Sequence, residues 1–309
     1  MDAAVDLPAD GKEMQGSEKP VLVKGKTTLH SVPCAKMPKK QARIAAAADE
    51  ELLKSVPAQD RARVLLEAMI RRKEERCGAT RCSRCWFPTN SSGTNYCVCS
   101  QMAPLSFTTR TRFLIYMHPR DWYNAGDDAK ILLSAAPART DLFVFGRPGD
   151  DDRLRDALAA AEAAVVLFPD EAAWTVDQFR QSWRQSSGAA LMGKEQVQEP
   201  SGDPELSIIV IDGTWNNVKQ MLKHFSRQVS PSTPHVRLQP TTLSVYARTQ
   251  TRADGVSSVE ATALLLQELG EDPDVCAALV RYIEVNNEAL RLKPVGRTDG
   301  SDDELGRDG

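Results

Sequence analysis

A short apolar run that ends at an acidic residue is the first candidate for chemistry in this chain: Ser207-Ile-Ile-Val-Ile-Asp-Gly-Thr-Trp215. The run predicts a buried strand, and the spacing of apolar residues in 216–222 predicts a helix directly after it. In α/β folds, ligands bind outside the carboxyl ends of the strands, where the N–H groups at the start of a helix are also presented. The turn at Asp212 is therefore a candidate ligand site, although Asp is also a favoured N-cap residue and could simply begin the helix.

Five cysteines fall within one short segment, spaced Cys77-x4-Cys82-x2-Cys85-x11-Cys97-x-Cys99. A CxxC pair followed by a CxC pair can offer four thiolates to one tetrahedral ion, which is typical of a structural Zn²⁺ site. Iron–sulfur clusters also use thiolates, but no redox partner motif is visible, so the spacing favours zinc. The predicted ligands are Cys82, Cys85, Cys97 and Cys99, with Cys77 as an alternative ligand. The alternative is a group of buried thiols.

The overall composition is that of an ordinary globular protein. The 309 residues are 41% hydrophobic and 26% charged, with a net charge of −3, so global charge gives no indication of a nucleic-acid partner. Basic side chains nevertheless crowd the approach to the cysteines, where they either contact phosphates or are simply solvated. They are Arg71, Arg72, Lys73, Arg76, Arg81 and Arg84.

No segment has the features of a membrane span or of a targeting signal. No apolar run approaches the roughly 18 residues that a bilayer crossing needs, and the acidic start lacks the charged and apolar regions of a signal peptide. We therefore expect an intracellular protein, cytoplasmic or nuclear. In a reducing compartment, seven cysteines indicate metal binding, catalysis or burial and not a disulfide framework.

Strand and helix patterns alternate along most of the chain, which predicts an α/β fold with a mostly parallel sheet and helices on both faces. The expected strands are residues 113–117, 142–145, 165–168, 207–211 and 236–238. The expected helices are residues 41–76, split in two by Pro57, then 127–134, 153–163, 171–183, 216–224, 258–269 and 275–292. The polar, glycine-containing stretch 186–203 is expected to be a loop or insertion.

Composition also divides the chain into regions. Residues 1–40 carry few large apolar side chains and residues 294–309 are acidic, so both are expected to be disordered tails. Residues 41–100 hold a helical segment and the cysteine cluster. Residues 101–293 hold the alternating pattern and form the main α/β domain.

Five motifs in order resemble the DTW-domain family. They are Cys82-x2-Cys85-x2-Pro88 with Cys97-x-Cys99, then Met117-His-Pro119, Leu167-Phe-Pro-Asp-Glu171, Asp212-Gly-Thr-Trp215 and Ser257-Ser-Val-Glu-Ala261. The resemblance runs from about residue 80 to 270. A single Asp-x-Thr-Trp is a weak signal, whereas five motifs in the right order are strong.

The resemblance implies an activity, a cofactor and a partner. Members of the family transfer the 3-amino-3-carboxypropyl group of S-adenosylmethionine to N3 of a tRNA uridine and release methylthioadenosine. The resemblance also implies that residues 101–293 are a DTW/SPOUT-like catalytic domain, knotted, with cofactor loops at the carboxyl ends of the strands. The expected partners are tRNA and S-adenosylmethionine, with no membrane. Nothing in the sequence indicates the oligomeric state, the tRNA or the uridine position.

The resemblance assigns candidate roles to residues of these motifs. Catalysis is expected at Asp212, Thr214 and Trp215, and cofactor binding at Leu167, Phe168, Pro169, Gly213, Ser257, Ser258 and Glu260. Asp212 either takes the N3 proton, orients N3–H or binds the cofactor's ammonium group. The structural alternatives are core packing for Trp215, a helix cap for Thr214, and a capping box for Ser257 with Glu260.

Basic residues near these motifs are candidates for contact with the tRNA backbone. They are Lys219, Lys223, Arg237, Arg248 and Arg252. The simpler alternative is that these charges are solvated. His118, directly after the first expected strand, is either a residue at the edge of the ligand site or a structural histidine.

Two other functions stay open. A SPOUT-type RNA methyltransferase would use the same cofactor but would release S-adenosylhomocysteine. A catalytically inactive zinc-knuckle RNA-binding protein would bind RNA without depending on Asp212. The sequence contains no Gly-rich phosphate loop, which argues against ATP-driven chemistry.

Overall fold

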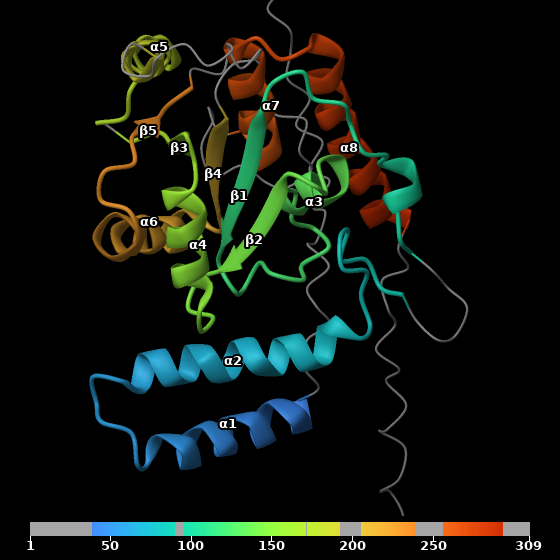
Figure 1. The fold of residues 1–309 in the computed structure, drawn as a ribbon. Coiled ribbons are helices and arrows are strands. Elements are labelled where there is room, and N and C mark those ends of the chain that lie inside the picture. Colours follow the sequence, from blue (N-terminus) through green and yellow to red (C-terminus); the bar gives the residue numbers. More distant parts are fainter. Residues whose placement is uncertain (1–38, 90–95, 171, 192–204, 239–255, 293–309) are drawn as a thin grey trace, which may run out of the picture.

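The computed structural model describes residues 39–89, 96–170, 172–191, 205–238 and 256–292. Its first elements are two helices, α1 (Lys39–Leu53) and α2 (Arg61–Gly78), which lie side by side as a hairpin (Figure 1). An ion pair between Arg72 and Asp49, with 2.6 Å between nitrogen and oxygen, joins the two helices. The predicted break at Pro57 is confirmed, because the segment between the helices contains it.

A sheet of five parallel strands forms the centre of the molecule, in the order β2-β1-β4-β3-β5. The strands are β1 (Thr111–Met117), β2 (Thr140–Val144), β3 (Ala163–Leu167), β4 (Leu206–Asp212) and β5 (His235–Val236). Every residue of β4 is buried, which explains why its sequence is a continuous apolar run and does not alternate. Met117 pairs with Asp212 and with Val144, so three strands end at one level of the same edge.

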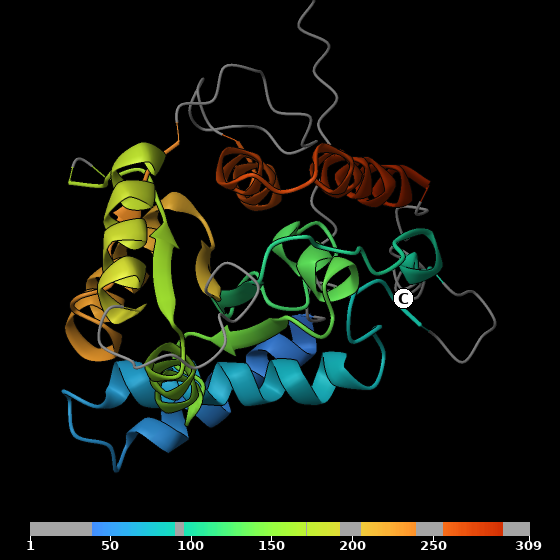
Figure 2. The ribbon, with the colours of Figure 1, turned by 45° about the horizontal axis from the view of Figure 1, so that its top comes forward.

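Helices cover both faces of this sheet. They are α3 (Leu132–Ala135, after the 3₁₀ turn η2, Ala129–Ile131), α4 (Asp150–Ala159), α5 (Val176–Leu191), α6 (Trp215–His224, before the π-helical turn η3, Phe225–Val229), α7 (Ser258–Leu269) and α8 (Pro273–Leu292). Phe113 and Ile115 of β1 pack with α7 and α8, and the intervening Leu114 packs with α4 and α6. The period-2 alternation of β1 thus separates two hydrophobic cores. Figure 2 shows α7 and α8 along one side of the sheet.

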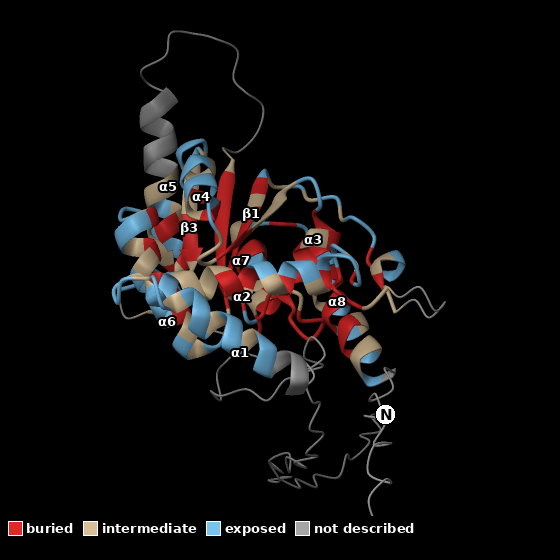
Figure 3. Cartoon of the chain, turned by 90° about the horizontal axis from the view of Figure 1, so that it is seen from below, coloured by how far each residue is buried: buried red, intermediate tan, exposed pale blue. Residues whose placement is uncertain are grey.

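Helix α2 lies across the edge at which the strands end (Figures 1 and 3). Lys73 is buried, and its Nζ donates hydrogen bonds of 2.8 Å to the carbonyls of Pro119 and Arg120, directly after β1. Leu66 packs over Gly146, which follows β2 with φ of +79°; a Cβ there would lie 2.2 Å from the Leu66 Cδ2 atom. Gly146 therefore allows both the left-handed turn and the close approach of α2.

The predicted α/β class, parallel sheet and strand positions are confirmed, and the boundaries of two helices are wrong. The helix expected at 153–163 is α4, which begins at Asp150, and residue 163 already belongs to β3. Three consecutive acids, Asp150 to Asp152, favour the earlier start because they face the positive end of the helix dipole. Helix α5 begins at Val176 and not at 171, and it continues through 186–191, which were predicted to be a loop. A single glycine lowers helix propensity without ending the helix.

Several predictions fall outside the described residues. These are residues 1–38 of the tail predicted at 1–40, the tail predicted at 294–309, the motif residue Glu171, and most of the expected insertion, 192–204. The last two residues of the predicted N-terminal tail, 39 and 40, belong to α1. The knot implied by the family resemblance stays a prediction, since residues 239–255, which join β5 to α7, also lie outside. No helix among the described residues is long and apolar enough to cross a membrane.

Candidate active site and metal centre

Asp212 ends β4 at the level where β1 also ends. Its side chain is only 5% exposed, and its backbone carbonyl accepts a 2.9 Å hydrogen bond from the His118 amide. Its Oδ1 accepts a 2.6 Å hydrogen bond from the Ser258 hydroxyl, so the end of β4 is joined to the start of α7. The alternative that Asp212 caps the following helix is wrong, because Thr214 is the N-cap residue of α6.

Two further carboxylates meet Asp212, and sequence reasoning missed both of them. Asp127 and Asp128 lie between β1 and η2 and are 2% and 3% exposed. One oxygen from each of these residues and one from Asp212 all lie within 4.8 Å of one another. Asp128 Oδ2 also accepts a 2.8 Å hydrogen bond from the Val259 amide in the first turn of α7. Three buried carboxylates thus converge where β1, β4 and α7 meet.

The electrostatic effect of this convergence appears in the pKa values of the two aspartates. Burial, and then the negative charge of Asp212, raise the pKa of Asp127 well above its usual range. Burial and Asp212 also raise the pKa of Asp128 to about 6, although the Val259 N–H stabilises its charged form. The cluster therefore favours the uptake of positive charge, either as protons or as a cationic group.

An aromatic pair lies beside the Asp-Gly-Thr-Trp turn. The rings of Phe168, after β3, and Trp215, at the start of α6, are 5.8 Å apart at an interplanar angle of 57°. Both side chains are partly exposed, so Trp215 is not a core residue. Leu167 ends β3 and is partly buried, and Pro169 after it is exposed. An exposed aromatic surface next to buried carboxylates can stack a planar ring.

The backbone of the turn is closely packed. A Cβ on Gly213 would lie 3.1 Å from the Cβ of His118, so a larger residue would require His118 to shift by a few tenths of an ångström. Thr214 is exposed and, although it is the N-cap residue, its side chain makes no capping hydrogen bond. Gly213 therefore fits closely against His118, while the Thr214 hydroxyl is not used to cap α6.

The predicted capping box at the start of α7 is confirmed. The Ser257 hydroxyl accepts from the Glu260 amide at 3.2 Å, and the Glu260 carboxylate accepts from the Ser257 amide at 2.7 Å. Because the Val259 amide donates to Asp128, two amides of the first turn of α7 already have partners within the protein. Ser258 uses its hydroxyl on Asp212, which makes it the residue that joins the helix to the motif.

His118 is a buried neutral residue. Burial, and then the charges of Arg120 and Lys73, lower the pKa of its side chain to about 4. Its Nδ1 accepts from the Arg120 amide at 3.2 Å and lies 3.3 Å from the side-chain nitrogen of Asn217, which we infer places the ring proton on Nε2. These contacts support the predicted alternative that His118 is a structural histidine, but they involve only one of its two ring nitrogens.

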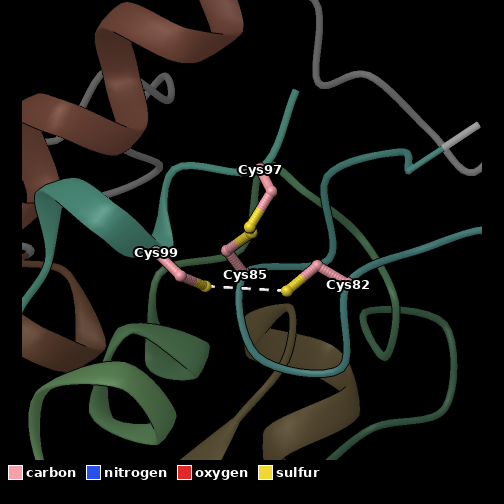
Figure 4. Close-up of side chains that lie close together, drawn as sticks. All are labelled: Cys82, Cys85, Cys97 and Cys99. Atoms are coloured by element: carbon pink, nitrogen blue, oxygen red, sulfur yellow. Dashed lines mark hydrogen bonds between the residues drawn. The ribbon is translucent and has the colours of Figure 1, made fainter. Parts of the chain in front are cut away.

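The four predicted zinc ligands converge, as Figure 4 shows. Their sulfurs all lie within 4.8 Å of one another, with 3.6 Å between Cys82 and Cys99 and 3.6 Å between Cys85 and Cys97. A tetrahedron with Zn–S bonds of about 2.3 Å has edges of about 3.8 Å, so the sulfur positions fit such an ion. Cys77 is buried but does not belong to this group.

The environment of the sulfurs also fits a metal centre. The neighbouring Cys85 thiol, with further contributions from Ser134 and Cys82, lowers the pKa of Cys99 to about 4 against the opposing effect of burial. The chain turns sharply between the pairs: Trp86 has φ of +57°, and the Arg81 guanidinium donates to its carbonyl at 2.8 Å. This centre lies outside the carboxylate cluster and packs into the core through Trp86, which indicates a structural role.

Three of the six basic residues near the cysteines hold the fold together. Lys73 and Arg81 are buried and bond to backbone carbonyls, and Arg72 is paired with Asp49. Arg71 and Arg84 are exposed. Of the other candidates for RNA contact, Lys219, Lys223 and Arg237 are exposed, whereas Arg248 and Arg252 lie outside the described residues.

The fold and this site define an α/β protein with a ligand site at the carboxyl ends of its parallel strands. A family model described as the DTW domain matches residues 79–290, which is more than half of the chain. The chain belongs to the DTW-domain family, which is associated with tRNA modification. Comparisons with curated proteins and with solved structures gave no significant match.

Proposed function

We propose that this protein is a tRNA-uridine aminocarboxypropyltransferase, which transfers the 3-amino-3-carboxypropyl group of S-adenosylmethionine to N3 of a tRNA uridine. One observation carries the proposal: Asp212 of the family motif is buried among carboxylates at the strand ends, beside a partly exposed aromatic pair. Such a site suits a cationic co-substrate and a planar base. Family membership supports the same conclusion.

The transfer reaction requires a proton acceptor next to N3 of the uridine. A bond forms between N3 and the γ-carbon of the co-substrate while the bond from that carbon to sulfur breaks, and the electron pair stays on sulfur as methylthioadenosine leaves. The N3 proton must depart, because neutral N3–H is a poor nucleophile. Asp212 accepts this proton, directly or through one water, with its Oδ2, since Oδ1 is held by Ser258.

The carboxylates also explain how the co-substrate is bound. S-adenosylmethionine carries a positive sulfonium and an ammonium group, and a buried negative cluster attracts both. Phe168 and Trp215 offer a stacking surface for adenine or uracil, with Leu167, Pro169 and Gly213 at the same edge. Thr214, Ser257, Ser258 and Glu260 position this edge or contact the bound groups. No other function is favoured by a specific contact.

The other parts of the molecule have supporting roles in this proposal. Zinc held by Cys82, Cys85, Cys97 and Cys99 fixes the segment between α2 and β1. Exposed Lys219, Lys223 and Arg237 contact tRNA phosphates. Residues 101–293 are the catalytic domain, with the knotted SPOUT topology, and the protein works inside the cell, in the cytoplasm or the nucleus.

Product analysis tests the proposal. Full-length protein is incubated with unmodified tRNA and S-adenosylmethionine, and nucleosides and small molecules are separated by mass spectrometry. The expected products are an aminocarboxypropyl-uridine and an equal amount of methylthioadenosine. S-adenosylhomocysteine as the only by-product would instead identify a methyltransferase.

A further inference from the structure

Asp127, Asp128 and Asp212 are three carboxylates that are buried together. Among the residues that the structure describes, the ion pairs do not include Asp127, Asp128 or Asp212. The buried amine of Lys130 donates instead to the carbonyls of Ala125 and Asp127 and to the side-chain oxygen of Asn286. Buried charges in proteins are paired, neutralised or bound to a metal, so this cluster needs an occupant.

Two oxygens of the cluster are buried and have no donor among the residues that the structure describes. They are Asp127 Oδ1 and Asp212 Oδ2, and each belongs to a residue that is at least nine-tenths buried. Two of the other four oxygens accept hydrogen bonds from outside the cluster: the Ser258 hydroxyl donates to Asp212 Oδ1, and the Val259 amide donates to Asp128 Oδ2. These bonds fix the orientation of two of the three carboxylates.

We propose that Asp127, Asp128 and Asp212 bind one hard divalent cation, of the Mg²⁺ or Mn²⁺ class. One oxygen from each residue lies within 4.8 Å of the others, which is a separation that a single ion can bridge. Such ions prefer carboxylate oxygens and usually complete their coordination with water or substrate. This site is separate from the cysteine cluster, whose sulfur ligands suit zinc.

The cation site goes beyond the proposed transfer reaction and is compatible with it. With all three carboxylates ionised, a divalent ion leaves one negative charge at the site, so the attraction for a sulfonium group is reduced and not reversed. With the ion bound, Asp212 would act as a ligand, and a water on the ion, whose pKa the ion would lower, would take the place of the water through which the N3 proton leaves. The competing occupant is a proton, because the carboxyls of Asp127 and Asp212 are close enough to share one.

Direct measurement of Mn²⁺ binding tests this proposal without any activity assay. The full chain, loaded with zinc and freed of loosely held ions, is titrated with Mn²⁺ at pH 7.5 and bound ion is followed by electron paramagnetic resonance. We expect one Mn²⁺ per chain, and binding weaker by at least about tenfold in Asp127→Asn and in Asp212→Asn. Asp156→Asn, at an exposed carboxylate on α4, is the matched control and keeps full binding.

A second measurement, made on wild-type protein, tests the proposal even if the variants fail to fold. In wild-type protein, Mn²⁺ or Mg²⁺ at about 100 times its dissociation constant raises Tm by about 5 °C or more, since an ion that binds only the folded state stabilises it. The absence of both binding and Tm shift would overturn the proposal in favour of a shared proton. Unchanged binding in Asp127→Asn would place the ion elsewhere and would also overturn it. Because neither readout uses tRNA, failure here leaves the transfer reaction untouched.

Discussion

Asp212 is the residue on which the proposed chemistry depends most. Asp212→Asn keeps the shape of the side chain and its contact with Ser258 but removes the charge that takes the N3 proton. We expect the single-turnover rate to fall by about 100-fold or more, in the range of a lost general base, while the Kd for tRNA changes by less than about threefold. Rapid-quench measurement of the modified uridine, with filter binding of tRNA, checks both.

Asp156→Asn serves as the control for this variant, because it removes an equal charge from the surface of α4. Its rate should equal that of wild type. If Asp212→Asn transferred the group at the wild-type rate, Asp212 would be a structural residue and the proton would leave by another route.

Trp215 tests the stacking surface. Trp215 is only partly exposed to solvent but contributes to neither hydrophobic core, so Trp215→Ala should leave the fold intact. Loss of one base stack costs about 1–3 kcal/mol, which corresponds to a Kd or KM about 5- to 150-fold higher for the stacked ligand. Titrations with S-adenosylmethionine and with tRNA show which ring is stacked. Trp215→Phe should restore most of the affinity, and equal affinities in all three proteins would rule out stacking.

At the residue scale, local patterns in the sequence predicted part of the candidate site. The strand end at Asp212 and the capping box of Ser257 with Glu260 follow from such patterns, since a strand end and a helix start can each be recognised within a few residues. Asp127 and Asp128 could not be placed in the same way. Their contact with Asp212 depends on the register of β1 with β4 and on the docking of α7, which are long-range features. Two adjacent acids between a strand and a helix were the only local signal.

At the scale of elements, the cysteine segment is the first to test. Cys82→Ser removes one of four converging sulfurs, so bound zinc should fall from one per chain to well below one, and the segment should become sensitive to protease. Zinc is counted by native mass spectrometry. Cys77→Ser is the matched control, because Cys77 is buried in the same region but lies outside the cluster. Full zinc retention in Cys82→Ser would exclude the proposed ligand set.

Glu271 joins the turn between α7 and α8 to the segment before β1. Its carboxylate accepts hydrogen bonds from the amides and hydroxyls of Thr108 and Thr109. Burial alone would raise the pKa of Glu271, but these bonds lower it to about 2. The charged form is therefore favoured in the folded protein, and its stabilisation is present above pH 4.5, the usual pKa of an unfolded glutamate.

The variant Glu271→Gln should reduce the free energy of unfolding at pH 7 by about 2 kcal/mol, the usual contribution of hydrogen bonds to a charged group. The difference between wild type and variant should narrow as pH falls from about 4.5 towards 2, because the wild-type carboxylate becomes protonated. Urea denaturation of both proteins at pH 7, 4 and 3 measures this difference. A difference that stayed constant across this range would show that the charge of Glu271 does not contribute.

The presence and type of the helices and strands were predicted better than their boundaries. All five strands were found because apolar β-branched runs are local signals, and the two N-terminal helices were separated by Pro57. The start of α4 was missed. The length of α5 was also missed, because a glycine within this helix suggested that residues 186–191 form a loop. The strand order could not be predicted from the sequence, because β4 inserts between β1 and β3 through contacts between residues far apart along the chain.

At the scale of the whole molecule, the arrangement restricts how tRNA can approach. Helix α2 covers the strand ends of β1 and β2, so it limits access to the carboxylate cluster from that side. Three of the six basic residues of this region attach α2 and the cysteine segment to the rest of the protein, while Arg71 and Arg84 are exposed. The exposed cations nearest in sequence to the motif lie on α6.

The most direct test of the central claim is the fate of S-adenosylmethionine labelled separately in its methyl group and in its aminocarboxypropyl group. With wild-type protein and unmodified tRNA, we predict that the aminocarboxypropyl label enters a uridine while the methyl label leaves as methylthioadenosine, in equal amounts, and that Asp212→Ala abolishes both. Transfer of the methyl label to RNA with release of S-adenosylhomocysteine, or no transfer with equal tRNA binding by wild type and Asp212→Ala, would contradict the proposed function.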